Sequence, residues 1–255
     1  MKKLRLVFVI FMSFAFLLLA SSCLSKHNKC VEYLSRYEHN ENIAYVDSGA
    51  IYFHNTKIKL ENGINGENIL YISSEKIYLH IGSSIYVTDY NFSNLEKMHT
   101  FERVGTNSRY TMYNQNFVCY EDSKGKLVYF IEESVEMAVD EFPYDTEYVI
   151  TKDGSSNPVY YVTDKKTNET KEINTSNNSK IFELEQAKYL EKLIALPIDN
   201  VKEYDGEIYV NCVSDFIVTT YKYDFETETY TFVDWTEAFG NCKMFFVKSG
   251  IGKNK

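Results

Sequence analysis

Five thiols are among the side chains of this sequence that could take part in chemistry. Besides Cys23 near the start, the chain contains Cys30, Cys119, Cys212 and Cys242. In an exported protein these four allow three disulfide pairings, and their spacing does not choose among them or against isolated buried thiols. They lie too far apart for zinc-ligand spacing, and no Cys-x-x-Cys occurs. We therefore predict possible disulfides, no metal site and no cofactor.

Carboxylates are abundant but do not form a recognisable catalytic pair. Asp224, Glu226 and Glu228 alternate, which places them on one face of an extended segment. A glycosidase needs two carboxylates about 5–9.5 Å apart across a cleft, and no spacing here fixes such a pair. The chain has no Gly-x-Ser-x-Gly elbow, phosphate loop or dinucleotide fingerprint. No catalytic residue is predicted.

Cys23 stands directly after an export-type leader. Residues 1–5 include three cations, and residues 6–20 form an apolar run that is shorter than the ~20 residues of a membrane-spanning helix. The motif Leu-Ala-Ser-Ser then precedes Cys23. It resembles the lipobox of bacterial lipoproteins, although Ala20 stands where Leu is commoner. Two alternatives remain open, an ordinary secretory signal cut near Ser22 and an uncleaved anchor helix.

The lipobox resemblance implies both processing and location. Residues 1–22 are expected to be removed as a signal peptide, leaving acylated Cys23 to hold the chain on the exported side of the cell membrane. Members of this class carry at least two acyl chains, which anchor stably where one does not. Because Leu24 rather than Asp follows Cys23, the resemblance favours the outer membrane if the cell has two. The lipid bilayer is thus the first expected partner.

The remaining chain is strongly acidic. The leader carries three cations and no acid, so the formal charge of −9 for the whole chain becomes −12 without it. Nucleic acid is excluded as a partner, since phosphate binding needs clustered Lys and Arg. An acidic body is also repelled by anionic lipid. Residues 23–42 are mostly polar and are predicted to form the lipidated tether.

From residue 43 onward, short β-prone runs alternate with turn residues, which is typical of an all-β domain. One run, Ile-Tyr-x-His, occupies residues 51–54 and 77–80, with a looser copy at 208–211. Another places an acid three residues after a tyrosine. This second repeat ends at Asp89, Glu132, Asp164 and Asp224.

These repeats resemble the blades of β-propeller proteins, in particular their Tyr-x-x-Asp hairpin. A small antiparallel meander cannot bury its faces alone, whereas several stacked meanders bury them against each other. At roughly 40 residues per blade, about five blades are expected. An irregular β-sandwich or an open meander is the alternative.

One segment departs from the β pattern. Apolar residues recur at three- and four-residue steps near residues 181–196, which predicts an inserted helix that ends before Pro197. We expect residues 43–255 to form a single all-β domain around this insertion.

Two functions fit these features. The first is a membrane-anchored, exported, non-enzymatic scaffold that binds an unknown protein or glycan partner. The alternative is a carboxylate-based, glycan-active hydrolase of the cell envelope, which would need a concave cluster of acids.

Overall fold

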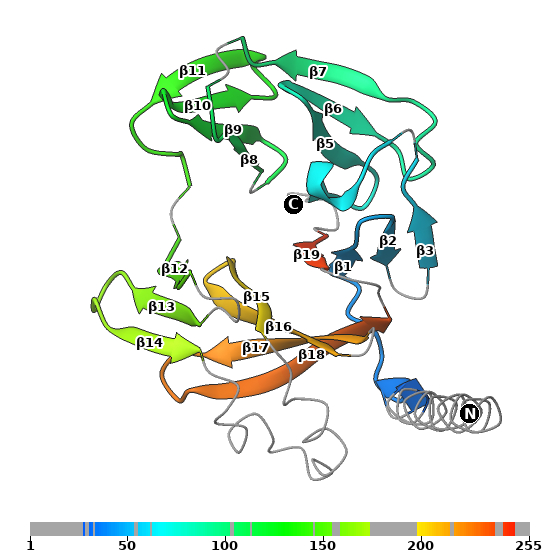
Figure 1. Cartoon of the computed structure of the whole chain (residues 1–255), viewed down its shortest axis with the longest axis vertical. Helices are drawn as coiled ribbons and strands as arrows, with labels where there is room; N and C mark the ends of the chain where they lie inside the picture. The colour runs from blue at the N-terminus through cyan, green and yellow to red at the C-terminus, as the bar shows by residue number, and fades with distance from the viewer. Residues whose placement is uncertain are drawn as a thin grey trace, which may run out of the picture.

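A computed structural model describes residue 28 and residues 31–247, apart from 33, 54–55, 62, 103–104, 113, 145, 155–158, 174–197, 215–216 and 238–241. Within this part, the chain forms five small antiparallel sheets arranged around a centre as a five-bladed β-propeller (Figure 1). The all-β prediction and the estimate of about five blades are confirmed. The helix predicted near residues 181–196 lies outside the described residues.

The blades are named here from 1 to 5, and their strands are given from the centre outward. Blade 1 contains β19 (Lys243–Phe246), β1 (Ile43–Val46), β2 (Ala50–Phe53) and β3 (Thr56–Lys59). Blade 2 contains β4 (Ile69–Ile72), β5 (Ile77–Ile81), β6 (Ser84–Thr88) and β7 (Glu96–Thr100), preceded by the short 3-10 helix η1 (Gly66–Asn68). Blade 3 contains β8 (Arg109–Thr111), β9 (Phe117–Asp122), β10 (Gly125–Phe130) and β11 (Val135–Val139). Blade 4 contains β12 (Tyr148–Lys152), β13 (Tyr160–Asp164) and β14 (Thr170–Ile173). Blade 5 contains β15 (Ile198–Tyr204), β16 (Glu207–Ser214), β17 (Ile217–Asp224) and β18 (Thr229–Glu237).

The acid of the Tyr-x-x-acid repeat makes the last turn of a blade. Asp89, Asp164 and Asp224 each accept a hydrogen bond from a backbone N–H two or three residues further on. Such Asx turns reverse the direction of the chain through local hydrogen bonds and do not depend on contacts with distant residues. Hydrogen bonds to the carboxylates also lower the pKa of Asp89 and Asp224.

The Ile-Tyr-x-His repeat does not keep one position in the blades. Its copies beginning at Ile77 and Ile208 form second strands, β5 and β16, whereas the copy beginning at Ile51 forms β2, the third strand of blade 1. The shift arises because blade 1 takes its first strand from the other end of the chain.

Apolar clusters between neighbouring blades form the core. One joins blades 1 and 2, a second joins blades 2 and 3, a third joins blades 4 and 5, and a fourth joins blades 5 and 1. In the second cluster, for example, Phe101 stacks on Tyr120 with 5.0 Å between ring centroids. At these four junctions each blade face is thus buried by its neighbour, as the repeat argument requires.

The junction between blades 3 and 4 differs from the other four. No apolar cluster of the described residues spans it. Instead, Phe117, Cys119 and Val128 of blade 3 are covered by Phe142 and Tyr144 of the connector that leads to β12. Figure 1 shows this connector crossing between the two blades.

The start of β12 is tied to blade 5. Glu203, near the end of β15, accepts hydrogen bonds from the backbone N–H groups of Glu147 and Tyr148, where β12 begins, at 2.8 and 3.1 Å. Blade 4 is thus held to blade 5 by a buried carboxylate as well as by the shared apolar cluster.

The strand β19 closes the ring. It pairs with β1 from Ile43↔Phe246 to Val46↔Lys243, joining chain segments about 200 residues apart. Phe246 stacks on Tyr204 of blade 5 with ring centroids 3.8 Å apart. One short strand thus completes blade 1 and seals its junction with blade 5.

Part of the predicted tether is fixed to the ring. Leu34 is fully buried in the cluster of blades 4 and 5, and the ring of Tyr37 lies 4.9 Å from that of Phe232 on β18. We call residues 34–42 the strap. Among the described residues, no helix has the length and apolarity to cross a membrane.

We expect Phe246→Ala to destabilise the protein by about 3–5 kcal/mol, because it removes a buried aromatic ring at the point of closure. Urea denaturation at pH 7 measures the change. The control is Met137→Ala on the outer strand β11, where the side chain is 52% exposed and the expected change is within about 0.5 kcal/mol. Equal midpoints for both variants would contradict the closing role of β19.

Candidate functional site

A cavity of about 530 Å³ lies where four blades meet. Its lining comes from the β1–β2 turn, from η1, from β12 and β13, from β15, and from the start of β19. We call it the axial cavity. Its volume lies within the range that small-molecule sites have.

A close backbone approach shapes one wall of this cavity. A Cβ atom added at Gly66 would lie 2.2 Å from the carbonyl oxygen of Asp47, so only glycine lets η1 pack against the β1–β2 turn. The carboxylate of Asp47 holds that turn. It accepts hydrogen bonds from the N–H groups of Gly49 and Ala50, both at 2.7 Å, and from the Tyr52 hydroxyl at 2.6 Å.

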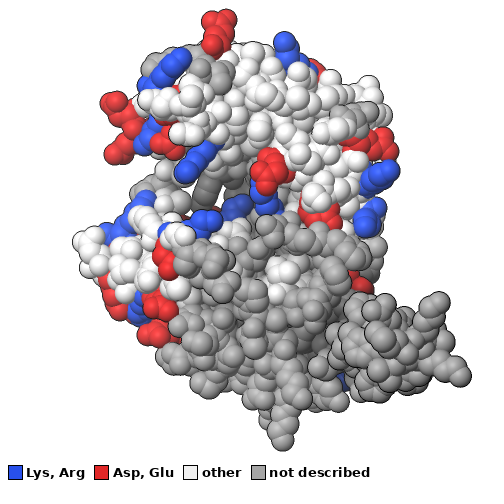
Figure 2. All heavy atoms as spheres, in the orientation of Figure 1, with Lys and Arg blue, Asp and Glu red and all other residues white. Residues whose placement is uncertain are grey.

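Cations outnumber the remaining acids around the cavity. Lys152 of β12 and Lys243 of β19 line it. The other lining carboxylate, Glu67, is 84% exposed and lies 4.0 Å from the Lys243 ammonium. Figure 2 shows Lys and Arg side chains gathered around a hollow in the middle of the molecule.

A third lysine, Lys202, lies on β15 two residues after Asn200, which lines the cavity. Its ammonium is 5.3 Å from the ring centroid of Phe245, and no described carboxylate is within ion-pairing distance of it. Burial lowers the pKa of Lys202 to about 8, and repulsion from Lys243 adds to the shift. The ring therefore keeps a half-buried cation with an aromatic face beside it and no counter-ion.

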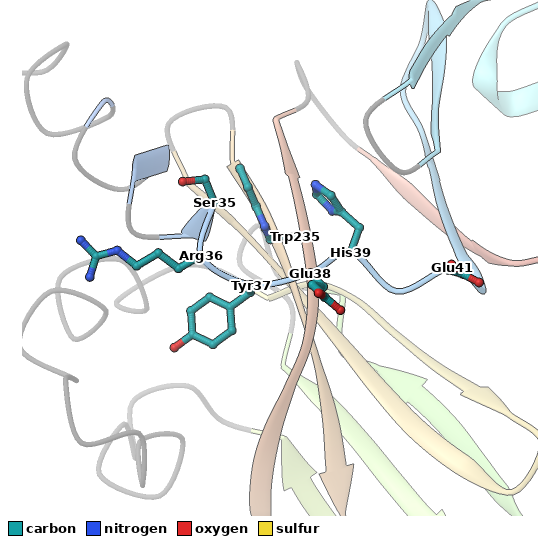
Figure 3. Close-up of a pocket in the computed structure, with 7 residues that line it drawn as sticks. All are labelled: Ser35, Arg36, Tyr37, Glu38, His39, Glu41 and Trp235. Atoms are coloured by element: carbon teal, nitrogen blue, oxygen red, sulfur yellow. The ribbon is translucent and has the colours of Figure 1, made fainter.

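A second cavity, also about 530 Å³, lies under the strap. It is lined by Ser35 to His39, Glu41 and Trp235 (Figure 3). In that view His39 and Trp235 lie side by side, and their rings stack with centroids 5.3 Å apart. The strap supplies most of the wall, so this cavity depends on how the strap is held.

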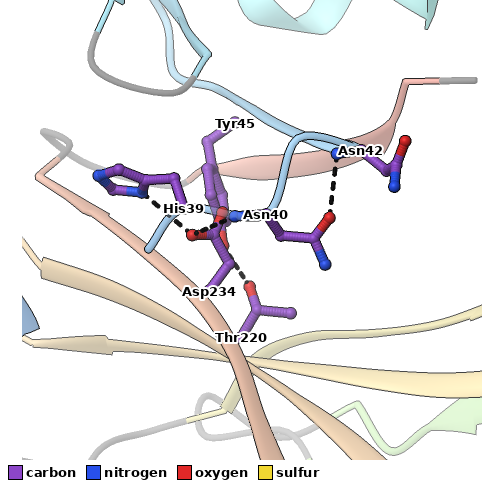
Figure 4. Close-up of polar contacts among 6 residues, drawn as sticks. All are labelled: His39, Asn40, Asn42, Tyr45, Thr220 and Asp234. Atoms are coloured by element: carbon purple, nitrogen blue, oxygen red, sulfur yellow. Dashed lines mark hydrogen bonds and ion pairs between the residues drawn. The ribbon is translucent and has the colours of Figure 1, made fainter. Parts of the chain in front are cut away.

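The strap is held by a buried carboxylate of β18. Asp234 accepts hydrogen bonds from His39 Nδ1 at 3.1 Å and from the Asn40 N–H at 3.3 Å (Figure 4). Burial raises the pKa of Asp234, and hydrogen bonds from the backbone of Trp235 and from His39 oppose that rise. Asp234 is thus a structural clamp for the N-terminal segment.

A polar chain beside the clamp links blades 1 and 5. The hydroxyl of Tyr45 on β1 bonds to Thr220 Oγ1 at 2.7 Å, and Thr220 donates in turn to Asn211 Oδ1 at 3.1 Å. Burial, followed by the charge of Asp234, raises the pKa of Tyr45 well above its usual value. This phenol therefore stays protonated and acts as a donor that ties the two blades together.

The cysteines singled out from the sequence do not converge. Cys23 and Cys30 lie outside the described residues. Cys119 is a free, buried thiol, and burial raises its pKa to about 12, which makes it unreactive. Cys212 and Cys242 are buried in two different clusters, and Cys242 also lines the axial cavity. Disulfide pairing of Cys30 stays a prediction.

The functional candidates that sequence reasoning missed are Lys152, Lys202 and Lys243. They lie up to 91 positions apart in sequence, in runs that otherwise indicate ordinary strands. Only the ring brings Lys152 and Lys243 into the lining of one cavity, with Lys202 close to Lys243. Within the described residues, no group of three or more His, Cys, Asp or Glu side chains is arranged to hold a metal ion.

Comparisons with known proteins yield only distant structural likeness. No protein-family model matches the chain, and no curated protein matches it in sequence. One similar structure is a protein of unknown function from Bacteroides caccae, with 10% identity and a TM-score of 0.27, covering 78% of this chain and 74% of that one. Another is the extracellular domain of a putative one-component system from B. thetaiotaomicron, with 16% identity and a TM-score of 0.28. The match spans 80% of this chain and 30% of the other, and likeness this distant assigns neither family nor function.

We expect Lys202→Met to stabilise the protein by about 2 kcal/mol at pH 7. The shift of the Lys202 pKa from 10.5 to about 8 corresponds to a destabilisation of about 3 kcal/mol, which the variant removes. Losing the contact between the ammonium and Phe245 costs the variant about 1 kcal/mol of this gain. The folded form holds fewer protons than the unfolded form between pH 8 and 10.5, so wild-type stability rises across this window. The stability advantage of Lys202→Met over wild type should therefore be smaller at pH 9.5 than at pH 7. Urea denaturation at pH 7 and pH 9.5 tests this, and a destabilised variant would contradict it.

We expect His39→Ala to cost about 1–3 kcal/mol at pH 7, because it leaves the buried Asp234 carboxylate short of a donor. In an Asp234→Asn background the same change should cost less. Urea denaturation of the four proteins gives the coupling energy, and the fluorescence of Trp235, the single tryptophan, reports locally on the clamp. Additive effects would show that the two side chains do not act together.

Proposed function

We propose that this protein is an exported, lipid-anchored, non-enzymatic binding scaffold whose binding site is the axial cavity. The observation that carries the proposal is a cavity of about 530 Å³ walled by strands and tight turns of four blades. Rigid elements position binding groups more accurately than mobile loops do. A ring of this kind offers a preformed site and needs no lid.

The carboxylates of the cavity favour binding over hydrolysis. A glycan-active hydrolase needs two carboxyl groups that face each other across the substrate. Of the two that line the cavity, Asp47 is occupied by three hydrogen bonds from its own turn, and Glu67 is largely exposed. Carboxylate-based hydrolysis therefore stays the second candidate.

The anchor is the second half of the proposal. It rests on the leader of residues 1–22 and on Cys23, which resemble the start of bacterial lipoproteins. Residues 23–42 link the lipid to the ring, and because Leu34 is buried in the core, the free part of this link is at most 11 residues long. An extended chain of that length spans at most ~40 Å, so the ring would stay near the bilayer.

The proposed setting defines the partners. The lipid bilayer holds acylated Cys23 on the exported side, at the outer membrane if the cell has two. The ring, with a formal charge of −12 together with its tether, meets a glycan or protein ligand there and not nucleic acid.

We expect the natural protein to partition into the detergent phase of a Triton X-114 extraction and Cys23→Ser to stay in the aqueous phase, because only Cys23 carries acyl chains. Cys30→Ser is the matched control and should behave as wild type. Mass spectrometry of the N-terminal peptide should show diacylglycerol on Cys23 and no residues 1–22. An unmodified Cys23, or an intact leader, would refute the anchor.

A further inference from the structure

The axial cavity concentrates positive charge in an acidic protein. Lys152 and Lys243 line it, and Lys202 lies beside Lys243 closely enough for repulsion to affect its protonation. Glu67 lies 4.0 Å from Lys243, and the carboxylate of Asp47 is engaged by its own turn. The two lining lysines balance the two lining carboxylates, and Lys202 beside them adds one further cation, although residues 23–255 carry −12 overall.

Strand geometry puts Lys202 next to the lining of the cavity. Asn200 of β15 and Lys243 of β19 line it. Lys202 and Phe245 each follow two residues later on the same strands, and the ammonium of Lys202 lies 5.3 Å from the ring centroid of Phe245. Residues two positions apart share one face of a strand and are separated by about 6.6 Å, so Lys202 lies on the same face of β15 as Asn200.

Keeping a cation at this position has a cost. An unpaired buried charge loses its hydration, and no described carboxylate compensates Lys202. A methionine would fill the same space and stabilise the ring. Charged groups that lower the stability of the fold in this way are typical of binding sites, where a bound ligand supplies the opposite charge.

Neutral polar groups complete the cavity. The Asn200 amide and the Ser48 hydroxyl line it, and neither makes a hydrogen bond to the described part of the protein. Such groups suit the hydroxyls of a sugar, and the volume of about 530 Å³ suits a monosaccharide with its water.

We propose that the axial cavity binds an acidic monosaccharide, with the carboxylate or phosphate of the sugar between Lys202 and Lys243 and its hydroxyls toward Asn200 and Ser48. This inference rests on the proposed function, because it names the ligand class of the same cavity. Either a carboxylate or a phosphate would serve as the anionic group, because the same ammonium groups pair with both.

The test is isothermal titration calorimetry on the full-length lipidated protein in detergent micelles at pH 7. The probes are glucuronate, glucose 6-phosphate, glucose and inorganic phosphate. We expect one or both acidic sugars to bind at least tenfold more tightly than glucose and than inorganic phosphate. The stronger of the two identifies the anionic group.

Two variants make the result specific to the cavity. Lys202→Met should weaken binding of the acidic sugar at least tenfold, and it should fold at least as stably as wild type, so misfolding does not explain the loss. Lys97→Met, on the outer strand β7, removes one cation elsewhere and should bind as wild type.

Each of the remaining outcomes rules out a stated part of the proposals. Equal binding of glucose and glucuronate, an unchanged Lys202→Met, or binding of no probe would overturn this inference and leave the anchored scaffold standing. Tight binding of inorganic phosphate with no gain from the sugar would overturn the carbohydrate part. Chemical turnover of a bound sugar, seen by NMR, would instead overturn the non-enzymatic function. The Cys23 experiment is independent of all these results.

Discussion

Every sheet in this protein has two faces that water must not reach, and a single sheet of three or four short strands cannot cover either of them. Neighbouring sheets supply the cover, so the chain is stable only as a stack. A stack with two ends would leave two faces exposed. The pairing of β19 with β1 removes those ends by bringing the last described strand into the first blade. Ring closure is therefore the constraint on which the other features depend.

Closure also creates the candidate site. The first strands of the blades approach one another around the centre (Figure 1). Residues from four blades line one cavity there. Lys152 and Lys243 line this cavity, and Lys202 lies close enough to Lys243 for their charges to repel, in surroundings that disfavour its charged form. A core optimised only for stability would place an apolar side chain at this position. The ring instead retains a charge there, which is the basis of the proposed anion binding.

The junction of blades 3 and 4 differs from the others, because no apolar cluster of the described residues spans it. Blade 4 has three strands, and the connector that leads to it covers the face of blade 3 with Phe142 and Tyr144. The hollow of Figure 2 lies in the same central region of the molecule, with basic side chains around it. The strap fastened by Asp234 lies on blade 5, adjacent to the closing junction of the ring. Strap, closure and cavity are thus linked through blades 1 and 5.

Local chemistry determined much of the fold in advance. Alternation of β-prone residues with turn residues predicts the strands, and the acid of the Tyr-x-x-acid repeat works within a few residues of itself, as the turns at Asp89, Asp164 and Asp224 show. Because these interactions are short in sequence, they can be inferred from sequence. The length of the repeat was sufficient to predict about five blades.

Long-range placement was decided only by the tertiary structure. The pairing of β19 with β1 joins distant segments through backbone hydrogen bonds, which carry no residue signature, and it shifts the Ile51 run to the third strand of its blade. Leu34 and His39 belong to a segment that is polar on average, yet the ring buries one and clamps the other. Lys152, Lys202 and Lys243 resemble ordinary solvated lysines until the ring brings them together. The sequence by itself determined the strands and the turns, and it is the sole basis for the predicted lipid attachment at Cys23. Closure of the ring determined which side chains share a site, because that depends on where distant strands meet.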